Sequence, residues 1–130
     1  MIQGQTSVLH WGDLLQQYRT LIYILLEKKN EAHISTVTVT ELSKVLRLSH
    51  ADIASRIKKC IGFGILEAVE PTGFRVLQSD LTYTPIGYMA QLLQVIKQLP
   101  ESSFEQQADA MQISVKELES VYGYFLYLLL

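Results

Sequence analysis

The sequence predicts a mainly α-helical protein with one small β-hairpin, and three observations lead to this fold class. Apolar residues recur at spacings of three and four over most of the 130-residue chain, as on one face of a helix. Capping residues, glycines and prolines divide this pattern into separate helices. Two strand-like runs flank a Pro-x-Gly turn near the middle of the chain, which is typical of a hairpin.

The composition is that of a folded domain. Hydrophobic residues make up 48% and charged residues 18% of the chain, which is enough apolar material for a core and unlike a disordered segment. The sequence has neither an apolar run long enough to cross a membrane nor a start typical of a secretory signal. The lone cysteine, Cys60, cannot form an internal disulfide, so we expect a cytoplasmic protein.

Positive charge is concentrated in the middle third of the sequence. Residues 41–79 carry six basic and four acidic side chains, a net charge of +2, whereas residues 80–130 carry two basic and six acidic ones, a net charge of −4. A polyanionic partner would therefore meet the middle third. An ordinary surface with a local excess of charge is the alternative interpretation.

The first helix is expected over residues 14–26, where apolar residues recur at helical spacing. Asp13 is its expected N-cap, and residues 28–30 are its expected end. Residues 8–11 before it are interpreted as a short apolar arm. Residues 34–37 after it are β-branched enough for a short strand.

Two helices joined by a tight turn are expected next. Thr38 and Glu41 have the spacing of a capping box, so one helix begins there, and Ser49 is the expected N-cap of the following helix. Gly62 and Gly64 end the second of these helices. The apolar residues expected to pack the pair are Leu42, Val45, Leu46, Leu48, Ile53, Ile57, Cys60 and Ile61.

A hairpin and three further helices complete the prediction. Residues 65–70 and 74–77 are the two strands, with the turn at residues 71–73. Thr84-Pro85 opens the next helix and Pro100 closes it. Its expected apolar stripe is Met89, Leu92, Leu93, Val95, Ile96 and Leu99. Two more helices are expected over residues 103–111 and 114–129.

The order helix, strand, helix, turn, helix, hairpin is the winged helix-turn-helix arrangement, here with additional N- and C-terminal helices. Residues 41–57 resemble the helix-turn-helix of winged transcriptional regulators, and residues 62–66 resemble the segment that leads into the wing. Residues 83–87 resemble the Thr-Pro-x-Gly entry to the helix after the wing in MarR-like regulators. The resemblance covers roughly residues 35–99. It implies a sequence-specific DNA-binding transcriptional regulator that acts as a homodimer.

Three segments follow from this interpretation. Residues 1–34 are expected to be an N-terminal arm and dimerisation helix. Residues 35–79 are the winged helix-turn-helix core, and residues 80–130 are a C-terminal helical extension.

Double-stranded DNA is the expected partner, because the exposed side of the second helix of such a pair fits the major groove. Arg56 and Lys59 have the reach for phosphates or guanine edges, and Ser55 is small enough for close approach. The wing and the first helix of the pair would add backbone contacts. The expected DNA-contacting residues are Thr38, Thr40, Lys44, Ser49, His50, Ala51, Asp52, Ser55, Arg56, Lys59, Thr72 and Arg75.

The main alternative is a winged-helix module that docks onto proteins in a replication or gene-expression complex, because a fold alone does not settle function. Asp52 on the expected reading face repels phosphate, and Ala51 and Ala54 offer no side-chain hydrogen bond. A third possibility is a small-molecule effector pocket near Trp11, Tyr18 and Tyr122. The residues alone do not distinguish such a pocket from core packing.

The C-terminal segment faintly repeats the central motif. A shift of 65 positions places Leu46, Leu48-Ser49, Ile53 and Ile57 over Met111, Ile113-Ser114, Leu118 and Tyr122. The outward residues of this second copy include Glu117 and Glu119, which suit DNA poorly, so we expect packing or dimerisation. The apolar tail beyond Val121 also indicates an interface. We expect the homodimer to use the first and last helices.

No enzymatic activity is expected. The sequence contains no glycine-rich phosphate loop, paired-carboxylate arrangement or nucleophile signature. His10, His33 and His50 lack metal-ligand spacing, so no metal or other cofactor is expected. Cys60 is interpreted as a core residue, with a redox-sensing thiol as the alternative.

Overall fold

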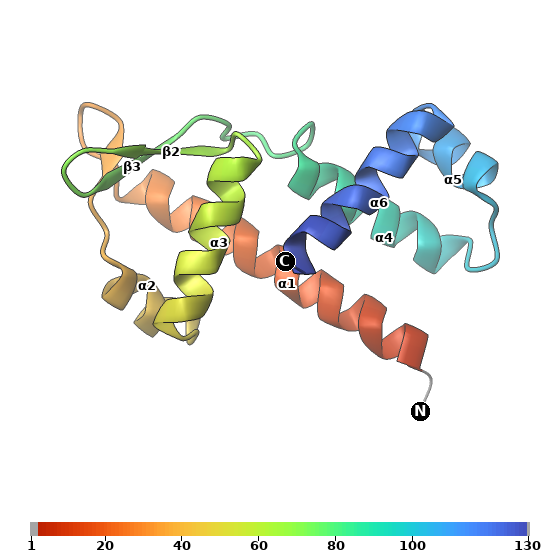
Figure 1. Ribbon diagram of the computed structural model, residues 1–130, viewed down its shortest axis with the longest axis horizontal. Helices are drawn as coiled ribbons and strands as arrows, with labels where there is room; N and C mark the ends of the chain where they lie inside the picture. Colours follow the sequence, from red (N-terminus) through yellow and green to blue (C-terminus); the bar gives the residue numbers. More distant parts are fainter. Residues whose placement is uncertain (1–2, 130) are drawn as a thin grey trace. The chain divides into compact units, whose positions relative to one another are not determined.

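The computed structural model describes residues 3–129, with side chains from Trp11 onward. Within this range, α1 (Gln3–Glu27), β1 (Ile34–Ser35), α2 (Val39–Leu46) and α3 (His50–Gly62) come first. They are followed by β2 (Leu66–Val69), β3 (Gly73–Val76), α4 (Pro85–Gln98), α5 (Phe104–Met111) and α6 (Val115–Leu129) (Figure 1). The strands form one antiparallel sheet in the order β1-β3-β2. The prediction of a mainly helical protein with a small sheet is confirmed.

The chain divides into two compact units, and α1 contributes to both. One unit is Gln16–Thr84, which contains the second half of α1, the helix pair α2–α3 and the sheet. The other contains the first half of α1 and helices α4 to α6. No helix in the described part of the chain is long and apolar enough to cross a membrane.

The sheet unit is built around a mainly apolar core. Leu21 and Leu25 from α1, Leu42 from α2 and Ile53 from α3 are all completely buried, as is Ile65 before β2. The short strand β1 is held against β3 with Ile34 opposite Arg75 and Ser35 opposite Phe74. A Cβ atom on residue 73 would lie 2.7 Å from Cγ2 of Ile34, so this close approach requires Gly73.

Caps and a left-handed residue define the α2–α3 pair. The hydroxyl of Thr38 accepts a hydrogen bond from the amide of Glu41 (3.1 Å), and that of Ser49 accepts one from the amide of Asp52 (3.1 Å). Between the helices, Arg47 has φ 56° and ψ 44°, and the amide of Leu48 donates to the carbonyl of Ser43 (3.2 Å). The turn therefore ends α2 and begins α3 within three residues.

The second unit repeats this arrangement 65 positions later, as the sequence shift predicted. Ser103 caps α5, and Gln112 has φ 59° and ψ 42°. The amide of Ile113 then donates to the carbonyl of Ala108 (3.0 Å), and Ser114 accepts from the amide of Glu117 (3.0 Å). Helices α4 to α6 enclose a core that includes the completely buried Met89, Leu92 and Leu118.

Several local expectations were wrong. Helix α1 begins at Gln3, so Asp13 is inside it rather than at its N-cap, and residues 8–11 are helical rather than an arm. Val45 is 64% exposed because it lies beside, not on, the face of α2 that buries Leu42. Ile61 and Leu99 are 40% and 45% exposed because each lies at the end of a helix, at the margin of the buried face.

Ile57 provides a test of the register of α3, because its side chain is only 6% exposed whereas that of Ile61 is 40% exposed. Ile57→Ala should lower the free energy of unfolding by about 2–5 kcal/mol, from lost burial and the cavity left behind. Ile61→Ala is the matched control and should cost less than about 1 kcal/mol. Denaturant titrations of both variants measure this; equal losses would show that α3 is rotated.

Candidate nucleic-acid interface

The exposed side of α3 is defined by what the opposite side buries. Ile53, Ile57 and Cys60 face the core of the sheet unit. Across the helix from them lies an exposed stripe with successive spacings of four, three and four residues: Ala51, Ser55, Lys58 and Gly62. We call these four residues the α3 stripe. Three of its residues, Ala51, Ser55 and Gly62, are small, which leaves the helix backbone beside them accessible to a close approach.

Part of the residue set expected to contact DNA is exposed on α3. His50, Ala51, Asp52 and Ser55 are all exposed in the first two turns of α3. Ser49 is exposed too, but its hydroxyl caps the helix. Thr38 has the same role at the start of α2, and Thr40 and Lys44 project from that helix into solvent.

Arg56 is used in holding α3 to α1. Its Nε and Nη2 atoms donate to Oε1 of Gln17 (3.2 and 2.7 Å), and Nη1 donates to the carbonyl of Asp52 (3.2 Å). The guanidinium carbon lies 5.9 Å from the centre of the Tyr18 ring, within cation–π range. The side chain is therefore positioned by three intramolecular partners, which reduces its freedom to contact a ligand.

The expectation that Lys59 faces outward was wrong, because Lys59 is only 6% exposed. It lies one turn after Arg56, on the side of α3 that packs within the unit. Lys58 takes the outward position instead and is exposed. Lys58 and Lys59 are three and four residues after Ser55, and both spacings keep a residue on the same face of a helix. The sequence alone therefore did not show which of the two lysines is exposed.

Arg47 is a further exposed cation that the sequence interpretation did not include. It is the left-handed residue that ends α2, so its side chain projects from the α2–α3 turn. Its position in the sequence, two residues before the expected cap Ser49, could have indicated that it is exposed in the turn. Together with Lys44 and Lys58 it gives the α2–α3 pair three exposed positive charges.

The hairpin contributes less charge than expected. Arg75 on β3 is directly opposite Glu67 on β2 and forms an ion pair with it, so its charge is largely balanced. Thr72 is exposed in the turn between these strands. A pocket of about 270 Å³ beside β3 brings Lys29 and His33 near Arg75, over a floor that includes Leu25. Neither Lys29 nor His33 is among the residues that the sequence predicts to contact DNA.

The aromatic residues considered for an effector pocket have partners within the protein. Trp11 packs edge-to-face on Phe125, with ring centres 4.8 Å apart. The hydroxyl of Tyr122 donates to Oε1 of Gln107 (2.7 Å), and Tyr18 lies under the Arg56 guanidinium. Each ring thus has a packing role. Among the described residues, no group of three or more metal-ligating side chains is present.

Comparisons with known proteins return nothing for this chain: no protein-family model, characterised protein or solved structure matches it.

Burial makes Cys60 an unreactive thiol, because desolvation raises its pKa from 9.0 to about 12. The native protein should therefore react with a thiol reagent far more slowly than the denatured chain. Since the unfolded thiol ionises near pH 9 and the native one near pH 12, the native state should lose stability as pH rises between these values. Denaturant midpoints measured across that range should fall more steeply for the wild type than for Cys60→Ala. Equal slopes, or rapid native labelling, would contradict the burial.

Proposed function

We propose that this protein is a winged helix-turn-helix transcriptional regulator that binds double-stranded DNA through the α3 stripe. The proposal rests above all on this stripe: Ala51, Ser55, Lys58 and Gly62 are exposed along one side of a helix whose other side is buried. A helix held in this way can enter the major groove, and small residues allow its backbone to approach the base edges. Ser55 offers a hydrogen bond, and Lys58 reaches phosphate or guanine.

The element order supports the winged helix-turn-helix part of the proposal. A helix, a short strand, two helices joined by a three-residue turn and a hairpin follow one another within one unit. In this arrangement α3 is the recognition helix and β2–β3 is the wing. Thr72 at the tip of the wing, with Lys29 and His33 beside β3, would face the DNA backbone.

Charge supplies the non-specific part of the binding energy. Lys44, Arg47 and Lys58 are exposed around the α2–α3 turn, and none of them has an ion-pair partner among the residues that the structure describes. Asp52 opposes them, since its exposed carboxylate lies in the first turn of α3. The resulting affinity depends on a few contacts and should fall steeply as salt is added.

The salt dependence of DNA binding tests this proposal. If three cations per protomer contact phosphates, a dimer makes six contacts, and the slope of log affinity against log salt should be roughly −5. Lys58→Ala should flatten that slope by about two units. Lys97→Ala, which removes an exposed lysine in the last turn of α4, is the matched control and should leave the slope unchanged.

Random-sequence duplex DNA titrated at several salt concentrations gives these slopes. The DNA proposal fails if the wild type does not bind duplex at low salt, or if both lysine variants change the slope equally.

A second candidate function is protein docking, and one observation favours it. Val45 on α2 and Ile61 on α3 are 64% and 40% exposed, so the same helix pair presents apolar as well as charged side chains. With Arg56 and Lys59 engaged inside the unit, the positive strip over α3 is narrow. If the wild-type protein does not bind duplex DNA at low salt in the titration above, this function is favoured over DNA binding.

We also propose that the regulator is a homodimer that uses the C-terminal part of α6. Leu126 and Leu129 are 65% and 69% exposed, which leaves a small apolar patch on this helix. On α1, Leu15, Leu21 and Leu25 are already buried within one chain, so among the α1 side chains that the structure describes, from Trp11 to Glu27, Tyr23 at 65% exposure is the main one offered to a partner. The proposed interface is therefore smaller than the one expected from the sequence, which used the whole first and last helices.

Light scattering at micromolar concentration tests the dimer. Leu126→Ser combined with Leu129→Ser should convert a dimer to a folded monomer, because two exposed leucines at the interface become polar. Leu77→Ser is the control, since Leu77 is 46% exposed and belongs to the other unit. A wild-type protein that is monomeric and soluble would contradict the proposal.

A further inference from the structure

The helix pair α5–α6 has the backbone caps of α2–α3 but the opposite charge. Residues 85–130 carry five acidic and two basic side chains, a net charge of −3, and all seven are exposed. The unit Gln16–Thr84 has a net charge of +2. Carboxylates repel nucleic-acid phosphates, so the duplicated pair is suited to a different kind of partner.

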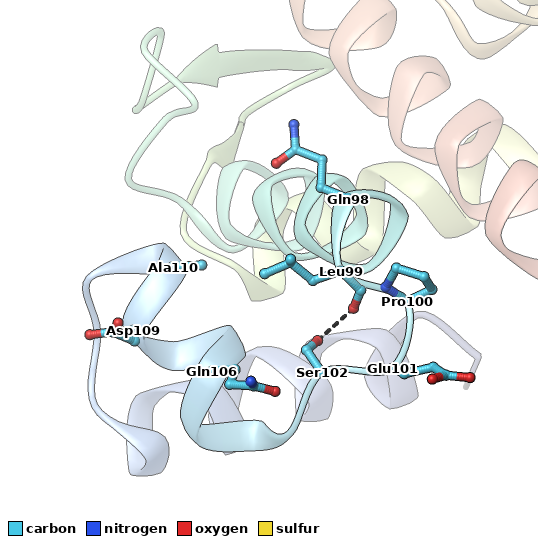
Figure 2. Close-up of a pocket in the computed structure, with 8 residues that line it drawn as sticks. All are labelled: Gln98, Leu99, Pro100, Glu101, Ser102, Gln106, Asp109 and Ala110. Carbon is cyan, nitrogen blue, oxygen red and sulfur yellow. Dashed lines mark hydrogen bonds between the residues drawn. The ribbon is translucent and has the colours of Figure 1, made fainter.

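A pocket lies where the end of α4 meets α5 (Figure 2). Its volume is about 650 Å³, within the range of ordinary binding pockets. Leu99, 45% exposed, extends towards Ala110 and gives the pocket an apolar surface, to which Pro100 adds. The hydroxyl of Ser102 donates to the carbonyl of Leu99 (2.6 Å), which fixes the chain at this corner.

The polar lining of the pocket is acidic. Glu101 and Asp109 both line it and are exposed, and no basic side chain is among the residues that line it. Gln106 also lines it, and its Oε1 accepts a hydrogen bond from the amide of Ser103 (2.8 Å). An occupant that matches this lining has an apolar side chain flanked by cations.

We propose that this pocket is a docking site for a basic amphipathic segment of a partner protein. A leucine-like side chain of the segment packs on Leu99 and Pro100, and its lysines or arginines pair with Glu101 and Asp109. Charge complementarity selects this occupant over an acidic or purely apolar one, because α5 adds the exposed Glu105 to the same negative charge. The proposal does not depend on DNA binding by α3.

The probe for this site is a fluorescein-labelled helical peptide of about 14 residues, four helical turns, composed of leucine and lysine with leucine on one face. We expect saturable binding by fluorescence anisotropy, and amide shifts centred on Leu99, Gln106 and Ala110 in the NMR spectrum of the protein. Peptides with leucine replaced by serine, or with lysine replaced by glutamate, should bind at least about tenfold more weakly.

Two pairs of variants localise the effect. Leu99→Ser should weaken binding about tenfold, whereas Leu77→Ser, with 46% exposure in the other unit, should not. Asp109→Asn should weaken it more than Glu119→Gln, which removes the same charge from an exposed residue of α6 that does not line the pocket. Unchanged thermal melts and dispersed NMR spectra show that each variant is folded.

Several outcomes would overturn the proposal. These are no binding of the leucine–lysine peptide, equal losses in the matched variants, or shifts centred on Leu126 and Leu129 instead of the pocket. Conversion of a wild-type dimer to a monomer by Leu99→Ser would show that the occupant is a second copy of this chain, which also overturns it. The DNA titration tests residues of the unit Gln16–Thr84, whereas the pocket belongs to the other unit. Failure of one proposal therefore leaves the other standing.

Discussion

The burial of one side of α3 is the constraint on which the candidate interface depends. Ile53 and Cys60 are completely buried and Ile57 nearly so, and this fixes the rotation of the helix about its axis. The left-handed Arg47 and the Ser49 cap then fix where the helix starts and in which direction it leaves α2. Rotation and direction together decide that Ala51, Ser55 and Lys58 are exposed. A helix of this length would not hold such a position by its own propensity, because isolated helices of about 13 residues are marginal in water.

Two of the cations in this unit hold the fold together instead of extending into solvent. Arg56 bridges α3 to α1 through Gln17, and Arg75 balances Glu67 across the hairpin. A guanidinium that is held by several acceptors gains in local stability but is less available to phosphate, since rebinding would break those hydrogen bonds. Lys44, Arg47 and Lys58 have no comparable restraint in the described structure and remain available. The unrestrained positive charge of the α2–α3 pair is therefore carried by residues that contribute little to its packing.

The helix pairs α2–α3 and α5–α6 share their backbone geometry but differ in the chemistry of their exposed side chains. Thr38, Arg47 and Ser49 correspond to Ser103, Gln112 and Ser114, and both sets produce the same caps and the same left-handed turn. The surfaces differ because the exposed residues other than these six do not form the caps or the turn and are free to vary. One pair presents small residues with cations, and the other presents carboxylates at the pocket beside Leu99. Two partners of opposite charge could thus be served by one repeated backbone arrangement.

The sequence by itself determined most of the elements and the Thr38 and Ser49 caps, because these depend on neighbours a few residues apart. The hairpin around residues 71–73 and the 65-residue repeat were also readable locally, whereas the start of α1 at Gln3 was not. It also located most of the core, since Ile53, Ile57, Met89 and Leu92 follow helical spacing. Only the tertiary structure decided which of Lys58 and Lys59 is exposed and that Arg56 is held by Gln17, 39 residues away. Those outcomes depend on where α1 and the sheet pack against α3. Such long-range contacts leave no mark in the local spacing of residues.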